Sequence, residues 1–245
     1  MMTKKQRTGI FPKKWKNCLI QLLFEEKCLI CGRLMSHFNR PPYPLCSNCE
    51  SLFRPLEQPF CRICGLPLIS EDNLCCRCRK RSYNFDKHRA LFVYGHYTRN
   101  LINAYKSSQY KQLSHFFSFK LARIICEEFP ERLIVPVPSC RSSVRKRGWD
   151  QMRVIGRILS KRYAIPYAEI LQRGKSAEQK SLSFSGRAAN LRGKIHIKPC
   201  CIDMKTTVLL IDDVFTTGAT MNECAWVLKS YGLSHVSALS IAIDT

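Results

Sequence analysis

The sequence predicts an α/β protein in which a mostly parallel sheet, flanked by helices, follows a small cysteine-rich module. Three observations support this prediction. Strand-like and helix-like segments alternate from about residue 88 to the end of the chain. Nine of the fifteen cysteines fall between Cys28 and Cys78. The apolar run at residues 208–211 leads directly into two adjacent aspartates and a turn of threonine and glycine.

Eight of these nine cysteines form four Cys-x-x-Cys pairs. This spacing lets both thiolates of a pair bind one ion through a tight turn, and two such knuckles complete a tetrahedral Zn²⁺ site. The alternative of a disulfide framework would need an oxidising compartment. The alternative of redox catalysis would need a thioredoxin-like pattern around the pairs, and none is present. We therefore predict one or two structural zinc ions, held by Cys28, Cys31, Cys46, Cys49, Cys61, Cys64, Cys75 and Cys78.

The spacing leaves open which pairs share an ion. Sequential pairing joins the first knuckle to the second and the third to the fourth; interleaved pairing is the alternative, and Cys76 could replace a neighbouring ligand. In either arrangement four sulfurs fill each site, so zinc would supply folding free energy rather than chemistry. We expect this double zinc-ribbon module, with a helix at its N-terminus, over residues 14–82.

The chain is strongly basic, with 40 Lys and Arg against 18 Asp and Glu and a formal net charge of +22. Such a surplus favours polyanionic partners, namely nucleic acid, phosphate compounds or an acidic membrane surface, although a generally basic organism or an association with ribosomes would also explain it. No apolar run approaches the roughly 20 residues of a membrane span. The short apolar patch at residues 18–24 is followed by two glutamates, and no signal-peptide cleavage site follows it. We therefore interpret it as an amphipathic helix. We expect a cytoplasmic protein without membrane insertion.

The α/β domain is expected over residues 88–245. Its strands are predicted from short apolar runs, and its helices from apolar residues that recur every three or four positions. The predicted strands are ALFVYGHY, RLIVPVP, TTVLLIDD and HVSALSIAI, at residues 90–97, 132–138, 206–213 and 235–243. The predicted helices are residues 101–108, 114–129, 150–163 and about 219–231.

The apolar run at residues 208–211 reads as a central strand, buried on both faces. Ligands bind at the carboxyl ends of such strands, which is where Asp212 and Asp213 lie. The turn at residues 216–220 opens a helix, whose first amides and dipole attract an anion. Gly218 has no Cβ to keep a phosphate away from the backbone. Acceptors for sugar hydroxyls thus stand beside donors for a phosphate, and a ribose 5-phosphate carries both groups.

Residues 208–220, VLLIDDVFTTGAT, resemble at all thirteen positions the phosphoribosyl-diphosphate (PRPP) signature of type I phosphoribosyltransferases. With the cysteine knuckles, the rest of the chain is similar to the ComF/ComFC family, which joins a double zinc ribbon to a type I phosphoribosyltransferase-like domain. The resemblance covers about residues 14–243. Besides the knuckles it rests on Leu101, Ile102 and Lys106, on VPVPSCRSSVRKRGWDQ at residues 135–151, and on Arg173, Gln179, Arg187 and Asn190.

The resemblance implies roles for two of these segments and for the signature at residues 208–220. Residues 136–141 would hold pyrophosphate, and residues 173–190 would include a mobile loop that closes over PRPP and neutralises the leaving group with Arg173, Lys175, Lys180 and Arg187. Mg²⁺ would accompany PRPP. The implied PRPP-binding residues are Asp212, Asp213, Thr216, Thr217, Gly218, Ala219, Thr220, Val137 and Pro138. The implied catalytic residues are Asp212, Asp213 and Arg173.

A second predicted site follows from charge. Between Arg141 and Arg162, eight basic residues face one acid, Asp150, and Trp149 is embedded among them. Cations trace a phosphate backbone and an aromatic ring can stack on a base, which fits single-stranded DNA. A solvated basic face and a packing role for Trp149 are the structural alternatives. The predicted nucleic-acid-binding residues are Arg141, Arg145, Lys146, Arg147 and Trp149.

Three functions remain open on this basis. The first is a PRPP- and DNA-binding protein of DNA uptake and natural transformation, for which the resemblance names a competence helicase or another DNA-uptake protein as the expected partner. The second is an active phosphoribosyltransferase of nucleotide metabolism or repair. Its acceptor is unidentified, because no segment resembles the hood that recognises a nucleobase. The third is a regulator whose PRPP site senses nucleotide status.

Overall fold

The computed structural model describes residues 26–35, 41–69, 73–107, 110–130, 132–174 and 193–244. The chain divides into two compact units, Met1–Ser51 and Leu52–Thr245. The predicted N-terminal helix and residues 175–190 of the predicted mobile loop lie outside the described residues. Within the described ranges no helix is both long and apolar enough to cross a membrane.

The first unit is built around two cysteine knuckles. Its described part holds one short helix, α2 (Ser47–Glu50), and an antiparallel bridge between Lys27 and Leu34. Gly32 follows the first knuckle with a φ of +69°, a left-handed conformation that glycine adopts without a steric penalty. So small a segment has little apolar core, which agrees with a fold that depends on its cysteines.

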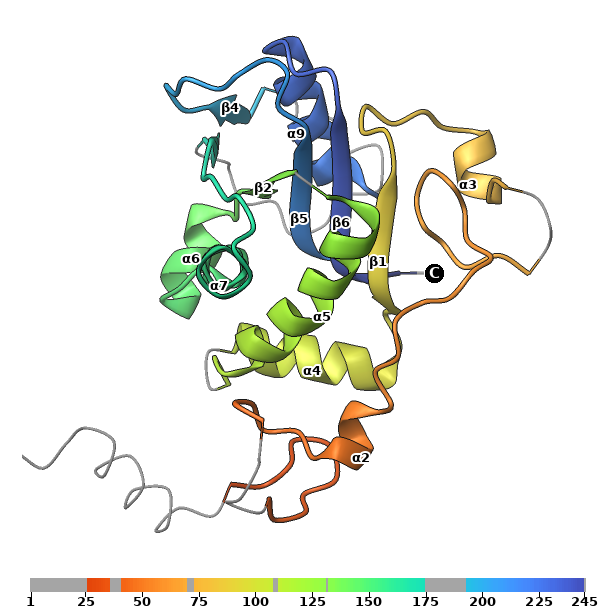
Figure 1. The fold of residues 1–245 in the computed structure, drawn as a ribbon, viewed down its shortest axis with the longest axis vertical. Helices are drawn as coiled ribbons and strands as arrows, with labels where there is room; N and C mark the ends of the chain where they lie inside the picture. The colour runs from red at the N-terminus through yellow and green to blue at the C-terminus, as the bar shows by residue number, and fades with distance from the viewer. Residues whose placement is uncertain are drawn as a thin grey trace, which may run out of the picture. The chain divides into compact units, whose positions relative to one another are not determined.

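The second unit contains a four-stranded sheet in the order β1-β6-β5-β2, with every neighbouring pair parallel (Figure 1). All eight residues of β6 and the first four of β5 are buried, as expected for central strands covered on both faces. The predicted parallel sheet is therefore confirmed. The strands are β1 (His88–Val93), β2 (Leu133–Pro136), β5 (Val208–Phe215) and β6 (Val236–Ile243).

Helices cover both faces of this sheet. The helices α5 and α7 pack against each other and reach β1, β2 and β5 on one face. The helix α9 lies on the other face (Figure 1). There it shares a buried cluster with β5, β6 and the cysteines of the second unit. The predicted strand at residues 90–97 is too long, because the chain leaves the sheet after Val93 and begins a helix at His96. The four long helices are α4 (His96–Lys106), α5 (Leu113–Glu128), α7 (Gln151–Tyr163) and α9 (Ala219–Ser230).

Four shorter elements of the second unit were not predicted. One is α6 (Arg141–Arg147), which has no buried residue and so no apolar periodicity to reveal it. The strands β3 (Leu171–Arg173) and β4 (Ile195–Ile197) pair antiparallel as a separate two-stranded sheet. The last is α3 (Cys76–Arg79), inside the fourth knuckle.

The second unit also contains the third and fourth knuckles, whose four cysteines are all buried against the α/β core. Compactness thus divides the chain at Ser51, inside the segment expected to form one double-ribbon module. The predicted module boundaries at residues 82 and 88 stay a prediction.

Candidate functional site

The candidate phosphate site lies at the carboxyl edge of the parallel sheet. The strand β5 carries Asp212 and Asp213 in its last four residues, and the turn into α9 follows at once. Beside it, the amide of Val137 donates to the carbonyl of Ile211 at 2.9 Å, which extends the β2–β5 pairing past the end of β2. The two predicted parts, the acidic pair and the segment at residues 137–138, therefore meet at one edge.

Asp213 is held by two side chains from distant parts of the sequence. The ammonium of Lys106, at the end of α4, lies 2.9 Å from Asp213 Oδ2, and the Nε2 amide of Gln151 donates to the same oxygen at 2.8 Å. The Asp213 side chain keeps 16% of its surface exposed. Lys106 and Gln151 belong to the resembled motifs, but no role was predicted for either residue. The structure brings both to the acidic pair.

Asp212 has a different environment from its neighbour. Burial, and then the negative charge of Asp213, raises the pKa of Asp212 to about 8. The amide of Asp213 donates to Asp212 Oδ1 at 2.8 Å, which opposes this shift without cancelling it. A bound cation or hydroxyl donor would favour loss of the Asp212 proton.

The turn at residues 216–220 has the form expected of an anion-binding loop. Gly218 precedes α9 in a left-handed conformation with a φ of +73°, and its carbonyl accepts the first helical bond from Asn222 at 2.8 Å. The Thr217 hydroxyl accepts from the amide of Ala219 at 3.3 Å. The amides of a first helical turn have no intrahelical partner and face outward along the axis, as the predicted phosphate site requires.

Arg173, at the end of β3, lies close to the segment that would hold pyrophosphate. Its charge contributes to lowering the pKa of Cys140, the residue before α6, after the hydrogen bond from Ser142 and despite burial. The Arg173 Nε is buried and has no hydrogen-bond partner among the described residues. An uncompensated buried donor beside the predicted pyrophosphate loop fits an anion that the chain itself does not supply.

The predicted nucleic-acid cations fall on α6. Its basic side chains, Arg141, Arg145, Lys146 and Arg147, form no ion pair within the described parts of the chain. On α7, by contrast, Arg153 and Arg157 reach Glu169 at 3.3 and 3.1 Å. The basic stretch thus contains two arginines that are paired with acidic side chains and six cations that form no ion pair in the described parts of the chain, a distinction that the sequence did not make.

Trp149 does not belong with these cations. Its side chain is only 8% exposed, and its ring packs edge-on against Tyr105 with centroids 4.8 Å apart. The hydroxyl of Tyr105 donates to the carbonyl of Gln151 at 2.9 Å, so the two rings support the residue that contacts Asp213. The prediction of a base-stacking tryptophan is wrong for this structure, because the indole is buried; the packing alternative is the one observed.

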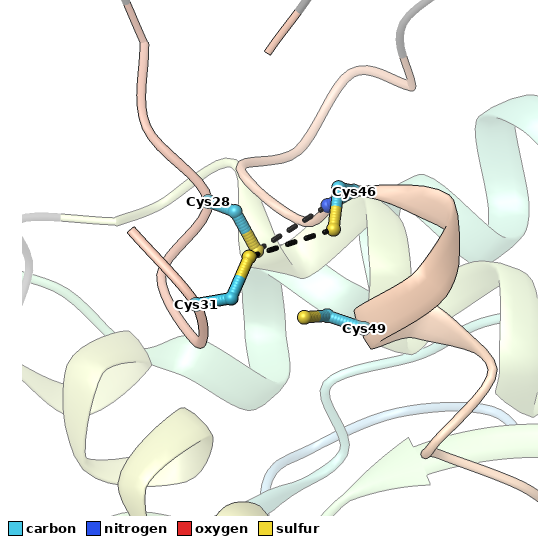
Figure 2. Close-up of side chains that lie close together, drawn as sticks. All are labelled: Cys28, Cys31, Cys46 and Cys49. Atoms are coloured by element: carbon cyan, nitrogen blue, oxygen red, sulfur yellow. Dashed lines mark hydrogen bonds between the residues drawn. The ribbon is translucent and has the colours of Figure 1, made fainter. Parts of the chain in front are cut away.

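The cysteines form two clusters by sequential pairing. Cys28, Cys31, Cys46 and Cys49 converge in the first unit (Figure 2), and Cys61, Cys64, Cys75 and Cys78 converge in the second. The sulfurs of each cluster lie within 4.8 Å of one another. Two of these sulfur–sulfur distances, Cys31–Cys46 at 3.8 Å and Cys64–Cys75 at 3.5 Å, are close to the edge of about 3.8 Å expected for a tetrahedral ZnS₄ group with 2.3 Å bonds.

The backbone around each cluster favours thiolates. The amide of Cys46 donates to the sulfur of Cys28 at 3.4 Å. Burial raises the pKa of Cys28. The hydrogen bond from the Cys46 amide and other backbone hydrogen bonds outweigh burial, however, and lower this pKa to about 6. Cys61 follows the same pattern, with a pKa lowered to about 7. Cys76 is exposed and outside both clusters. Burial raises the pKa of other cluster cysteines, among them Cys49 and Cys64, and a bound Zn²⁺ would deprotonate them. Eight cysteine ligands and no open position fit two structural zinc ions.

Fold and site together define a phosphoribosyltransferase-like α/β domain preceded by paired Cys₄ centres. Residues 19–79 match the family model of the double zinc ribbon domain. Over nearly the whole chain the sequence is similar to Competence protein F of Haemophilus influenzae (27% identity, 89% of this chain and 97% of the relative). It is also similar to Competence protein ComFC of Streptococcus pneumoniae (25% identity, 88% and 99%). The resemblance to the ComF/ComFC family is therefore confirmed.

Similarity to solved structures is weaker. A purine phosphoribosyltransferase from Pyrococcus horikoshii aligns with a TM-score of 0.32 and 22% identity, over 52% of this chain and 70% of its own. An adenine phosphoribosyltransferase from Thermoanaerobacter pseudethanolicus gives 0.35 and 16%, over 55% and 83%. Such scores carry no weight for the site; the sheet order and the loop after β5 define the fold.

Proposed function

We propose that this protein binds PRPP with Mg²⁺ at the carboxyl edge of the sheet and single-stranded DNA along α6, and that it acts in DNA uptake during natural transformation. The competence names of its relatives support the pathway. The observation that carries the PRPP site is the meeting of the acidic pair, the phosphate turn and residues 137–138 at one edge. Reduced cysteines suited to zinc support a cytoplasmic location.

In the proposed complex each part of the edge has its own role. The amides at residues 216–220 bind the 5-phosphate, and the acidic pair binds the ribose hydroxyls or a Mg²⁺ ion that bridges to them. Lys106 fixes the orientation of Asp213, and Arg173 faces the pyrophosphate. The Mg²⁺ ion neutralises phosphate charge when bound.

Titration calorimetry with PRPP and Mg²⁺ tests the site. We expect the double variant Asp212→Asn/Asp213→Asn to lose at least tenfold in affinity, since a sugar and its cation lose their anionic ligands. Asp203→Asn is the matched control, because Asp203 is an exposed aspartate that caps the amide of Lys205. The proposal would fail if PRPP gave no heat of binding with the wild-type protein, or if the double variant bound PRPP as tightly as the wild type.

The DNA site is tested by comparing two charge-matched variants. Arg145→Ala/Lys146→Ala removes cations with no ion pair in the described structure, and Arg153→Ala/Arg157→Ala removes cations already paired with Glu169. Single-strand binding falls with log salt by about 0.7 per phosphate contact, so loss of two contacts should flatten the slope by about 1.4. We expect this flattening for the α6 variant alone. Equal effects of the two variants would leave only a nonspecific attraction of charge.

Active phosphoribosyl transfer is the second candidate. It is favoured by the raised pKa of Asp212 beside a second carboxyl, because strongly shifted carboxyls are typical of catalytic sites. In transfer the C1–O bond to pyrophosphate breaks, an acceptor adds at C1, and the carboxylates stabilise the cationic ribosyl centre. Release of pyrophosphate from PRPP in the presence of a panel of bases and amines measures this activity. Release no greater than that of the double aspartate variant would leave a binding protein.

A further inference from the structure

We propose that the second cysteine cluster, Cys61–Cys78, positions the phosphate turn through His88, Phe215 and Tyr83, so that zinc at this cluster, and not at the first, sets the affinity of the turn for a phosphate ligand. The proposal rests on the proposed PRPP site for its ligand. Its physical basis, a chain of buried contacts from the knuckles to residues 215–218, is independent of that ligand.

Hydrogen bonds join the third knuckle to strand β1 at His88. The amide of His88 donates to the carbonyl of Ile63 at 2.7 Å, and its ring Nδ1 lies 2.6 Å from the carbonyl of Cys64. Gly65, directly after the knuckle, has a φ of +67°, and a Cβ there would lie 2.7 Å from the His88 carbonyl. The backbone of the knuckle thus rests directly on the strand, and any movement of Cys64 is transmitted to the imidazole.

The imidazole joins the knuckle to the central strand β6. A carbonyl only accepts, so Nδ1 carries the proton and donates to Cys64. Nε2 lies 3.0 Å from the hydroxyl oxygen of Ser240, and that hydroxyl donates to the carbonyl of Ala242 at 2.9 Å. The carbonyl of Cys64, the ring of His88 and the central strand β6 are therefore held together.

From His88 the contacts continue to the phosphate turn through Phe215. The two rings stack with centroids 4.1 Å apart. Phe215 ends β5, and its ring lies so close to Gly218 that a Cβ there would stand 2.5 Å from Phe215 Cζ. The turn therefore packs directly on the Phe215 ring, and the orientation of this ring determines the direction in which the amides of residues 218–220 point.

Two further contacts join the same cluster to the turn. The hydroxyl of Tyr83, five residues beyond Cys78, donates to the carbonyl of Thr217 at 3.3 Å. Arg77, inside the fourth knuckle, donates to the carbonyl of Asp244 at 3.1 Å, and the amide of Asp244 donates to Phe215 at 2.8 Å. Three separate routes from one Cys₄ cluster therefore converge on residues 215–218. The first cluster belongs to the other compact unit and supplies the control.

The test uses the full chain and variants that leave all eight cysteines in place. Tyr83→Phe removes the hydroxyl that bonds Thr217 but keeps the ring, and His88→Asn keeps an amide donor for Cys64 but removes the stack on Phe215. We expect both to bind two zinc ions per chain, to bind PRPP about three- to tenfold more weakly, the range of one hydrogen bond or ring contact, and to exchange the amides of residues 216–221 faster with deuterium. Tyr97→Phe, at an exposed tyrosine, is the matched control.

Loss of one zinc ion separates the clusters. Cys31→Ser, in the first cluster, should lose one ion and keep wild-type exchange at residues 216–221, whereas Cys64→Ser should lose one ion and lose that protection. If the wild type fails to bind PRPP while exchange still responds to Tyr83→Phe, the proposed ligand is wrong and the coupling stands. Unchanged exchange and unchanged PRPP affinity in both Tyr83→Phe and His88→Asn would overturn the inference.

Discussion

The substitution Gly218→Ala measures how tightly the phosphate turn is packed. Gly218 has a φ of +73°, where a side chain costs about 1 kcal/mol. The added Cβ would also lie 2.5 Å from Phe215 Cζ and 3.0 Å from Tyr83 Cε1, and overpacking of this kind costs a further 1–3 kcal/mol or so. We expect a loss of about 2–4 kcal/mol in the free energy of unfolding, measured by urea denaturation. For a unit of this size the melting temperature should fall by about 4–16 °C.

Gly148 provides the matched control, because its φ is +76° and a Cβ there would meet nothing within 4 Å. Gly148→Ala should therefore lose only the backbone contribution, about 1 kcal/mol. The difference between the two variants isolates the contact with the Phe215 and Tyr83 rings. Equal losses of unfolding free energy in the two variants would refute the packing argument, and with it the packing of the turn on the Phe215 ring.

The remaining predictions concern Asp212, Asp150 and Cys76. Because the pKa of Asp212 is raised to about 8, the folded state holds a proton that the unfolded state has lost above about pH 4; the free energy of unfolding should fall as pH rises from 4 to 8, and Asp212→Asn should abolish this fall. If the carboxylate binds Mg²⁺, calorimetric affinity for PRPP should rise over pH 6–8 and then level off. Asp150 caps α7 by accepting from the amides of Met152 and Arg153, so Asp150→Ala should cost about 1 kcal/mol in urea denaturation, and no loss would deny the cap. Cys76→Ser should retain two zinc ions by metal analysis, since Cys76 lies outside both clusters; loss of an ion would contradict the sequential pairing.

The main elements of the α/β domain could be predicted because their signals are local. The helices α5 and α7 show apolar residues at helical spacing, and β5 and β6 are continuous apolar runs. The helix α6 could not, because it buries no side chain and its sequence therefore has no period. The three-residue strands β3 and β4 escape for another reason: each is too short to show alternation, and their pairing partners lie more than twenty residues apart.

The candidate site divides in the same way. Asp212, Asp213 and the phosphate turn occupy one continuous stretch, so the motif located them. The partners of Asp213 come from α4 and from the start of α7, and no local pattern connects them. Trp149 shows the limit of reasoning from composition, because a tryptophan among cations reads as an exposed ring until the packing of Tyr105 buries it.

The sequence by itself determined the eight cysteine ligands, the parallel sheet and the segment that carries the acidic pair, since each depends on spacing or periodicity within one short stretch of chain. Only the tertiary structure decided which knuckles share an ion, which cations are already neutralised, and that the second cluster lies against the phosphate turn. Those facts depend on contacts such as His88 with Phe215 and Arg77 with Asp244, between residues more than a hundred positions apart. The folding of the whole chain, rather than any local preference, brings such residues together.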